Sequence, residues 1–149
     1  MPPGCWNISH SSMAKPNKSR LIQAAIAARK NAVAPYSRFR VGAALLTGDG
    51  KIVSGANVES VSYGLTCCAE RVALFKALTD GKKSFRAIAI VAALENGPMP
   101  CGACRQLLAE YAAEAVVWVA DTRVPKRVRE FTVRDLLPGA FSAFPRNSD

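Results

Sequence analysis

The chain has 149 residues, of which 50% are hydrophobic, and a formal net charge of +9. This length supports one compact domain with a core and is too short for two ordinary domains. The most apolar runs, such as Ile88–Leu94, stop far short of the roughly 18 residues that a membrane span needs, so we expect no membrane partner.

The positive charge is concentrated near the N-terminus. Residues 1–48 hold 7 of the 20 Lys and Arg residues and no Asp or Glu, whereas the rest has 13 basic and 11 acidic residues. A second basic cluster contains no aromatic residue that could stack on a base, as single-strand binders usually require. Its members are Arg123, Lys126, Arg127 and Arg129. Both patterns favour a solvated basic face and argue against a nucleic-acid partner.

Residues 1–14 mix Pro, Gly, Ser and Asn without periodicity, which predicts a disordered arm or a start-site or tag extension. A single domain is then expected over residues 15–149. The five cysteines are an odd number, and no secretory signal with an apolar segment precedes them. A reducing, cytoplasmic location fits these features, and clustered thiols there are more often metal ligands or catalytic groups than disulfides.

The first predicted element is an Ala-rich helix that begins at a Ser19 cap and ends before Pro35. Its apolar positions follow the 3.6-residue period at Leu21, Ile22, Ala25, Ile26 and Ala32. We expect this helix to cover one face of a sheet. Alternation over residues 39–45, followed by the turn at residues 48–50, predicts a hairpin of two antiparallel strands.

A second helix is predicted over residues 68–78, with Val72, Phe75 and Leu78 on its apolar side and Gly81 as its C-terminal stop. Further elements follow in the order strand, helix, strand, strand and short helix, at residues 88–91, 101–111, 116–119, 130–133 and 134–137. Strands that alternate with helices imply parallel pairing in this half of the chain.

Two fragments carry groups that can bind a metal, Cys68-Ala69-Glu70 and Pro100-Cys101-Gly102-Ala103-Cys104. One βα unit of chain separates them, which allows both to lie at helix N-termini on the same edge of the sheet. Zinc accepts three thiolates at roughly 2.3 Å and, in catalytic sites, keeps a fourth position for water. We therefore expect one zinc ion on Cys68, Cys101 and Cys104.

Other interpretations of the cysteines and other candidate ligands are weaker. Cys67 would point about 100° around the helix from Cys68 and is expected to be a packing residue. Cys5 and His10 lie in the predicted arm and are poor candidates for a fourth ligand. An isolated C-x-x-C is also typical of thioredoxin-like redox sites, but here it accompanies Cys-x-Glu, and the two together form the signature of zinc deaminases.

From Ser19 through Phe141 the chain resembles the small cytidine deaminases. Beyond the cysteine fragments, the motifs that carry this resemblance are residues 34–37 (APYS), 39–45 (FRVGAAL), 57–59 (NVE), 69–71 (AER) and 136–141 (LLPGAF). The resemblance implies a three-layer α/β/α sandwich around a five-stranded mixed sheet. It also implies a zinc-dependent enzyme that hydrolytically deaminates free cytidine and deoxycytidine to uridine and deoxyuridine with release of ammonia. This is a step of pyrimidine salvage, and the small family members are homotetramers with shared active sites.

Chemistry and resemblance assign roles to the remaining candidate residues. Zinc lowers the pKa of bound water for attack on C4 of cytosine, and Glu70 is expected to carry protons from that water to N3 and to the departing amine. Arg71, three positions after Cys68, is expected to donate to thiolate sulfur and offset the charge of the cluster.

Asn57 and Glu59 lie two apart near a strand end and can face the same side to bind a sugar hydroxyl. The resemblance implies that this hydroxyl is the ribose 3′-hydroxyl, and it supplies four further substrate contacts. These are stacking of Phe39 on the pyrimidine, backbone contact of Ala69 with the base edge, approach of Tyr63 to the 5′-hydroxyl, and stacking of Phe141 over a neighbouring subunit's base.

Two rival functions remain open. The same zinc chemistry could act on an antibiotic nucleoside or on RNA or DNA, although a 3′-hydroxyl clamp at Glu59 would obstruct a continuing strand. Many polynucleotide deaminases also have His where this chain has Cys68. A non-catalytic zinc module for partner binding would need a fourth protein ligand and would have no use for Glu70.

Overall fold

The predicted strands form one mixed sheet of five strands in the order β2-β1-β3-β4-β5. The computed structural model describes residues 14–144. The strands are β1 (Val41–Thr47), β2 (Ile52–Ala56), β3 (Phe85–Ala92), β4 (Val116–Asp121) and β5 (Val128–Thr132). The helices are α1 (Lys18–Arg29), α2 (Ala69–Thr79), α3 (Gly102–Tyr111) and α4 (Val133–Leu136), with a 3-10 turn η1 (Tyr63–Leu65).

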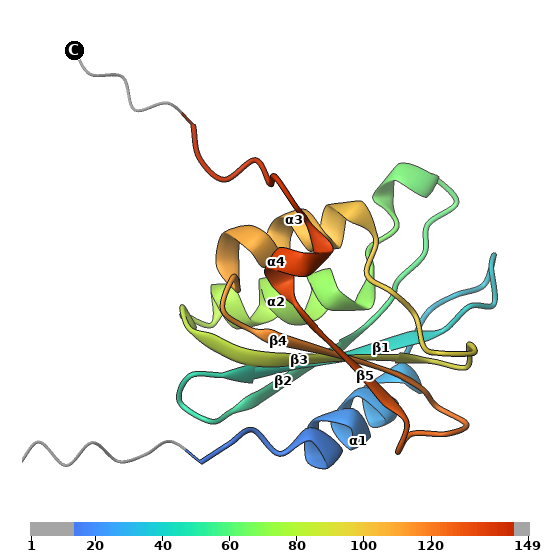
Figure 1. The fold of residues 1–149 in the computed structure, drawn as a ribbon. Coiled ribbons are helices and arrows are strands. Elements are labelled where there is room, and N and C mark those ends of the chain that lie inside the picture. The colour runs from blue at the N-terminus through green and yellow to red at the C-terminus, as the bar shows by residue number, and fades with distance from the viewer. Residues whose placement is uncertain (1–13, 145–149) are drawn as a thin grey trace, which may run out of the picture.

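Helices cover both faces of the sheet. Figure 1 shows α1 on one face and α2, α3 and α4 on the other, so the predicted three-layer α/β/α fold is confirmed. Within residues 14–144 no helix has the length and apolar character to cross a membrane. The predicted arm, including Cys5 and His10, lies outside the described residues except for Ala14.

The directions of the strands bring two helix starts to one edge. β1 pairs antiparallel with β2 and with β3, so β2 and β3 run in the same direction. β3 pairs parallel with β4 across α3, which confirms the predicted parallel pairing. α2 follows β2 and α3 follows β3. Because parallel strands end at the same edge, the N-termini of α2 and α3 lie near each other.

The sheet separates two apolar clusters. Leu74, Leu108 and Val119 belong to the cluster under α2 and α3, and Leu21 and Trp118 belong to the one under α1. β1, β3 and β4 are almost completely buried, as expected for strands covered on both faces.

The predicted start of α1 is wrong by two residues. Asn17, not Ser19, is the N-cap, and its side-chain oxygen accepts a hydrogen bond from the backbone N–H of Arg20 at 3.0 Å. Asn and Ser are equally good capping residues, so composition alone does not separate them. The helix leaves Leu21 and Ile22 buried against the sheet, as predicted.

The predicted apolar side of α2 is right only in part. The helix buries Ala69, Glu70, Ala73, Leu74 and Ala77, while Val72 and Leu78 are partly buried and Phe75 is 43% exposed. α2 packs close to β2: a Cβ atom at Gly55 would lie 2.6 Å from the backbone nitrogen of Ala73. Small side chains therefore make up much of the buried side, and Phe75 is not part of the core cluster under α2.

A glycine on β1 allows the same close approach of α1. A Cβ atom at Gly42 would overlap the carbonyl oxygen of Ala25 and lie 2.8 Å from the Cβ atom of Arg29. We expect Gly42→Ala to lower the free energy of unfolding by about 2 kcal/mol, because helix and strand must separate to admit a methyl group. Denaturant unfolding followed by circular dichroism measures this change.

Gly64→Ala is the matched control, since a Cβ atom there would meet no heavy atom within 4 Å. Equal unfolding midpoints for the two variants would show that α1 does not depend on the small residue at position 42.

Candidate metal centre and active-site cavity

Three cysteine side chains converge where α2 and α3 begin. Cys68 is the N-cap of α2 and Cys101 is the N-cap of α3, while Cys104 lies in the first turn of α3. The Sγ atoms are 3.8 Å apart for Cys68 and Cys101 and 3.6 Å apart for Cys101 and Cys104. Sulfur atoms bound tetrahedrally to zinc at 2.3 Å are separated by about 3.8 Å. The cluster therefore fits one zinc ion.

The three cysteines are the whole of the cluster within residues 14–144. All their Sγ atoms lie within 4.8 Å of one another, and no other described His, Cys, Asp or Glu belongs to this group. A set of three protein ligands is typical of a catalytic zinc site, which keeps a position for water, and not of a closed structural site.

Cys67 lies outside the cluster, but for a different reason than the one predicted. It precedes α2 and forms an isolated antiparallel bridge with Val58, so its backbone is extended. The backbone N–H of Cys67 donates to the carbonyl oxygen of Val58 at 2.8 Å. Neighbouring side chains of an extended chain point to opposite sides, which turns Cys67 away from the side that Cys68 faces.

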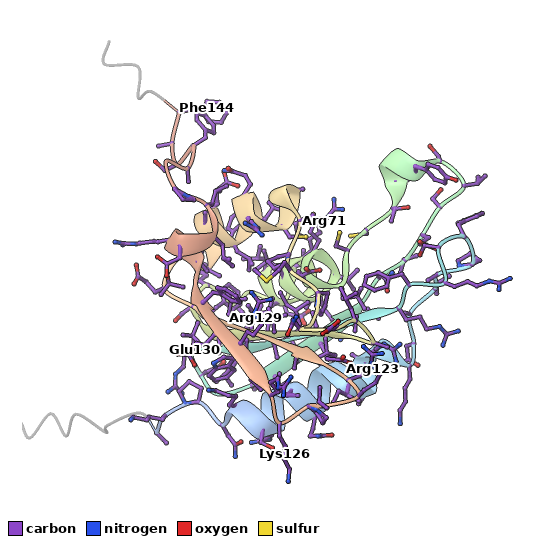
Figure 2. The ribbon with its side chains drawn as sticks, turned by 45° about the vertical axis from the view of Figure 1, so that its right-hand side comes forward. Arg71, Arg123, Lys126, Arg129, Glu130 and Phe144 are labelled. Atoms are coloured by element: carbon purple, nitrogen blue, oxygen red, sulfur yellow. The ribbon has the colours of Figure 1, made fainter. Side chains whose placement is uncertain are left out.

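Arg71 lies beside the cluster at the start of α2, as Figure 2 shows. Its Nη2 atom donates to Sγ of Cys68 at 3.5 Å and to the carbonyl oxygen of Thr66 at 3.1 Å. Hydrogen bonds from Cys104, Arg71 and Cys101 lower the pKa of Cys68 to about 5. The hydrogen bond to Cys68 and burial raise the pKa of Cys104. The cluster thus stabilises a thiolate first at Cys68.

Glu70 is a buried carboxylic acid at the same helix start, with 5% of its surface exposed. Burial, followed by the nearby Cys68, raises the pKa of Glu70 to about 7. A carboxyl group with a pKa near neutrality can both accept and release a proton under ordinary conditions. This position is therefore suited to general acid–base chemistry.

A cavity of about 270 Å³ opens beside the cluster. This volume is near the lower end of the range for small-molecule sites, about 300 Å³. Its walls include two of the cysteines and five other predicted site residues, namely Phe39, Asn57, Glu59, Ala69 and Glu70. A hollow of about 330 Å³ near the start of α1 is lined by no acid or thiol, so the cavity beside the cluster is the better candidate.

Asn57 and Glu59 hold the segment that carries Phe39. Oδ1 of Asn57 accepts from the backbone N–H of Val41 at 2.8 Å, and its Nδ2 donates to the carbonyl oxygen of Phe39 at 2.8 Å. Oε1 of Glu59 accepts from the N–H groups of residues 36 and 37 at 3.0 and 3.1 Å. The sequence did not predict these hydrogen bonds, because the partners of Asn57 and Glu59 are backbone atoms distant along the chain.

Two predicted substrate contacts lie outside the cavity of their own chain. Tyr63, in η1, is 79% exposed, and Phe141, after α4, is 57% exposed. The ring of Phe141 contacts that of Phe144 edge-on at 5.4 Å. Figure 2 shows Phe144 on the segment that leads away from the helices. A single copy of the chain does not bring these aromatic rings to the cluster.

Pro98 and Met99 also line the cavity and were not predicted. They follow Asn96 and Gly97, which have φ angles of 64° and 76°. A Cβ atom at Gly97 would lie 2.8 Å from backbone atoms of Ala120, so this turn packs tightly onto β4. The Asn-Gly dipeptide at residues 96 and 97 was a signal for such a turn.

Comparisons with known proteins agree with this site. The family model described as "Cytidine and deoxycytidylate deaminase zinc-binding region" matches residues 15–120. The cytidine deaminase of Halalkalibacterium halodurans is 50% identical over 132 residues, which cover 88% of this chain and 98% of that protein.

Solved structures agree as well. The crystal structure of cytidine deaminase from Burkholderia pseudomallei has a TM-score of 0.81 and 48% identity, covering 85% of this chain and all of that one. That of the Mycobacterium tuberculosis cytidine deaminase has a TM-score of 0.74 and 41% identity, covering 87% and 100%. With its three-cysteine cluster and these matches along most of its length, the chain belongs to the family of zinc-dependent cytidine deaminases.

Proposed function

We propose that the protein hydrolytically deaminates free cytidine and deoxycytidine to the uracil nucleosides with release of ammonia, as a step of pyrimidine salvage in the cytoplasm. The observation that carries the proposal is the buried Glu70, 5% exposed, at the helix start that also supplies Cys68. The thiol ligands agree with a reducing compartment.

The protein's own contribution to the reaction is proton transfer. Zinc bound by the three cysteines would supply a water of lowered pKa for attack on C4 of the base. Glu70 accepts a proton from that water and gives it to N3, and a second transfer through the same carboxyl releases the C4 amine as ammonia. Its raised pKa of about 7 suits both directions of transfer.

The residues that line the cavity support the proposed sugar and base contacts. Phe39 stacks on the pyrimidine, and backbone groups at Ala69 contact the base edge. Asn57 and Glu59 bind the ribose 3′-hydroxyl: Nδ2 of Asn57 has a second hydrogen beside the one that it donates to Phe39, and the carboxylate of Glu59 has a second oxygen beside Oε1. A clamp on the 3′-hydroxyl favours a free nucleoside over a polynucleotide.

We infer a homotetramer in which subunits share active sites. The support is the exposure of Tyr63 and Phe141, large aromatic side chains that lie outside their own cavity. In the assembly, Tyr63 approaches the 5′-hydroxyl and Phe141 stacks over the base of a neighbouring subunit. Phe75, exposed on α2, is a further apolar group available for burial between subunits.

Glu70→Gln tests the proton-transfer step. We expect kcat for cytidine to fall by about 10²- to 10⁴-fold, because the amide cannot exchange protons. Zinc content and unfolding temperature should remain those of the parent protein. Loss of absorbance at the cytosine band measures turnover, and Glu110→Gln on the exposed side of α3 is the matched control.

The same assay separates the rival functions. Cytidine, deoxycytidine, blasticidin S and a single-stranded oligonucleotide are compared at equal concentration. Preference for either of the last two would overturn the nucleoside proposal. Unchanged turnover in Glu70→Gln would remove the carboxyl from the mechanism, and a zinc-binding module without enzymatic activity would turn over none of the four.

Arg71→Ala tests the charge beside the cluster. Groups that donate to metal ligands typically contribute about 10- to 100-fold to metal affinity or activity, so we expect a loss in that range with the fold retained. Competition with a chromogenic chelator measures zinc affinity. Arg127→Ala removes an exposed cation elsewhere and should change neither quantity. Parent-like zinc affinity and turnover in Arg71→Ala would exclude Arg71 from the site.

Phe141→Ala tests shared active sites. Loss of one base–aromatic stacking contact, about 1–3 kcal/mol, should raise KM about tenfold or more. Mixed assemblies of Phe141→Ala and Glu70→Gln chains should contain sites with a low KM, since an intact Glu70 receives Phe141 wherever the neighbour is a Glu70→Gln chain. Light scattering should give the mass of four chains. A mixture whose kinetics equal the sum of its components would contradict contribution between subunits.

A further inference from the structure

Arg105 on α3 donates hydrogen bonds to two separate segments of backbone. Its Nε atom donates to the carbonyl oxygen of Pro100 at 2.8 Å. Its Nη1 atom donates to the carbonyl oxygen of Leu136 at 2.9 Å. The side chain is partly buried and follows Cys104 directly in the sequence. One arginine thus joins the chain beside the metal ligands to the end of α4.

The first of these bonds acts on a metal ligand. Pro100 precedes Cys101, so the carbonyl oxygen that Arg105 holds belongs to the same peptide plane as the backbone nitrogen of Cys101. Because this plane is rigid, a displacement of Cys101 also displaces the carbonyl oxygen. The length of the hydrogen bond from Arg105 therefore depends on where Cys101 lies.

The second bond acts on the C-terminal segment, residues 136–144. Leu136 is the last residue of α4, and α4 lies beside α3 in Figure 1. The next residue of α3 adds a contact to the same segment, as Nε2 of Gln106 donates to the carbonyl oxygen of Phe141 at 2.8 Å. Two neighbouring side chains of α3 thus hold the C-terminal segment by its backbone.

We propose that Arg105 is a positioning residue that couples zinc loading at Cys101 to the position of the C-terminal segment. The guanidinium group is planar and its donors have fixed directions, so movement of one carbonyl tilts the group and weakens the bond to the other. A lysine in its place carries the same charge but has a single nitrogen on a flexible stem. The coupling rests on zinc binding by the cysteines and not on which nucleoside is the substrate.

Hydrogen–deuterium exchange on the parent protein tests the coupling without any substitution. Exchange of residues 135–137, where the backbone N–H groups of Asp135 and Leu137 are hydrogen-bonded, is compared before and after zinc is removed with a chelator. We expect faster exchange there and no change in residues 80–82, whose N–H groups are hydrogen-bonded at the other end of α2. No change in residues 135–137, or an equal rise in both segments, would overturn the proposal.

Arg105→Lys tests the bridging geometry. We expect zinc affinity, measured by competition with a chromogenic chelator, to fall about tenfold or more. We also expect exchange of residues 135–137 to be fast with or without zinc. Arg134→Ala is the matched control, because Arg134 lies on α4 but its side chain is 80% exposed and, among the described residues, forms an ion pair with Glu114 alone. This variant should keep the parent's affinity and its zinc-dependent exchange.

The outcomes distinguish a bridge formed by the Arg105 guanidinium from a requirement for positive charge alone at this position. Parent-like zinc affinity together with zinc-dependent exchange in Arg105→Lys would mean that a positive charge is sufficient, which overturns the bridge. If Arg105→Lys does not fold, the exchange of the parent protein still decides the coupling. Failure of the nucleoside assay alone would leave both measurements interpretable, because neither uses a substrate.

Discussion

Repulsion among three sulfur anions is the constraint around which this end of the protein is built. Two thiolates 3.8 Å apart repel by about 4 kcal/mol at an effective dielectric constant of 20. A helix N-terminus offsets about 0.3–1 kcal/mol of this repulsion for each neighbouring negative charge. Arg71 contributes one positive charge at 3.5 Å from Cys68. These terms stabilise one thiolate, consistent with the lowered pKa of Cys68 and the raised pKa of Cys104. Ionisation of all three sulfur atoms requires a divalent cation.

The sheet brings the sulfur atoms together because it determines where the helices start and how closely they pack on the strands. β2 and β3 run in the same direction, so the helices that follow them start at one edge. Gly55 allows α2 to approach β2 so closely that its buried side chains are mostly alanine. This approach determines where Cys68, Glu70 and Arg71 lie relative to α3. Phe75 is not part of the core cluster under α2 and is exposed.

How well the sequence predicted each structural feature depends on whether the residues that form it are close together along the chain. The cysteine fragments have short internal spacings and chemistry specific to a metal, so the cluster was predictable. The alternation of strands with helices predicted the parallel pairing, and the resemblance to the small cytidine deaminases implied the fold class. The start of α1 was misplaced because Asn17 and Ser19 cap equally well. Phe75 was misplaced on the buried side of α2 because the packing of this helix depends on Gly55, a residue of another element.

Three of the links that escaped prediction share one chemistry: a side chain donates to a backbone carbonyl outside its own element. Asn57 holds Phe39 in this way, and Arg105 holds Pro100 and Leu136. Every residue offers a carbonyl oxygen, so the acceptor leaves no pattern in the sequence and survives substitution of its own side chain. Only the donor is specified by residue type. The shape of the cavity therefore depends on a few donor side chains more strongly than on the identities of the residues they hold.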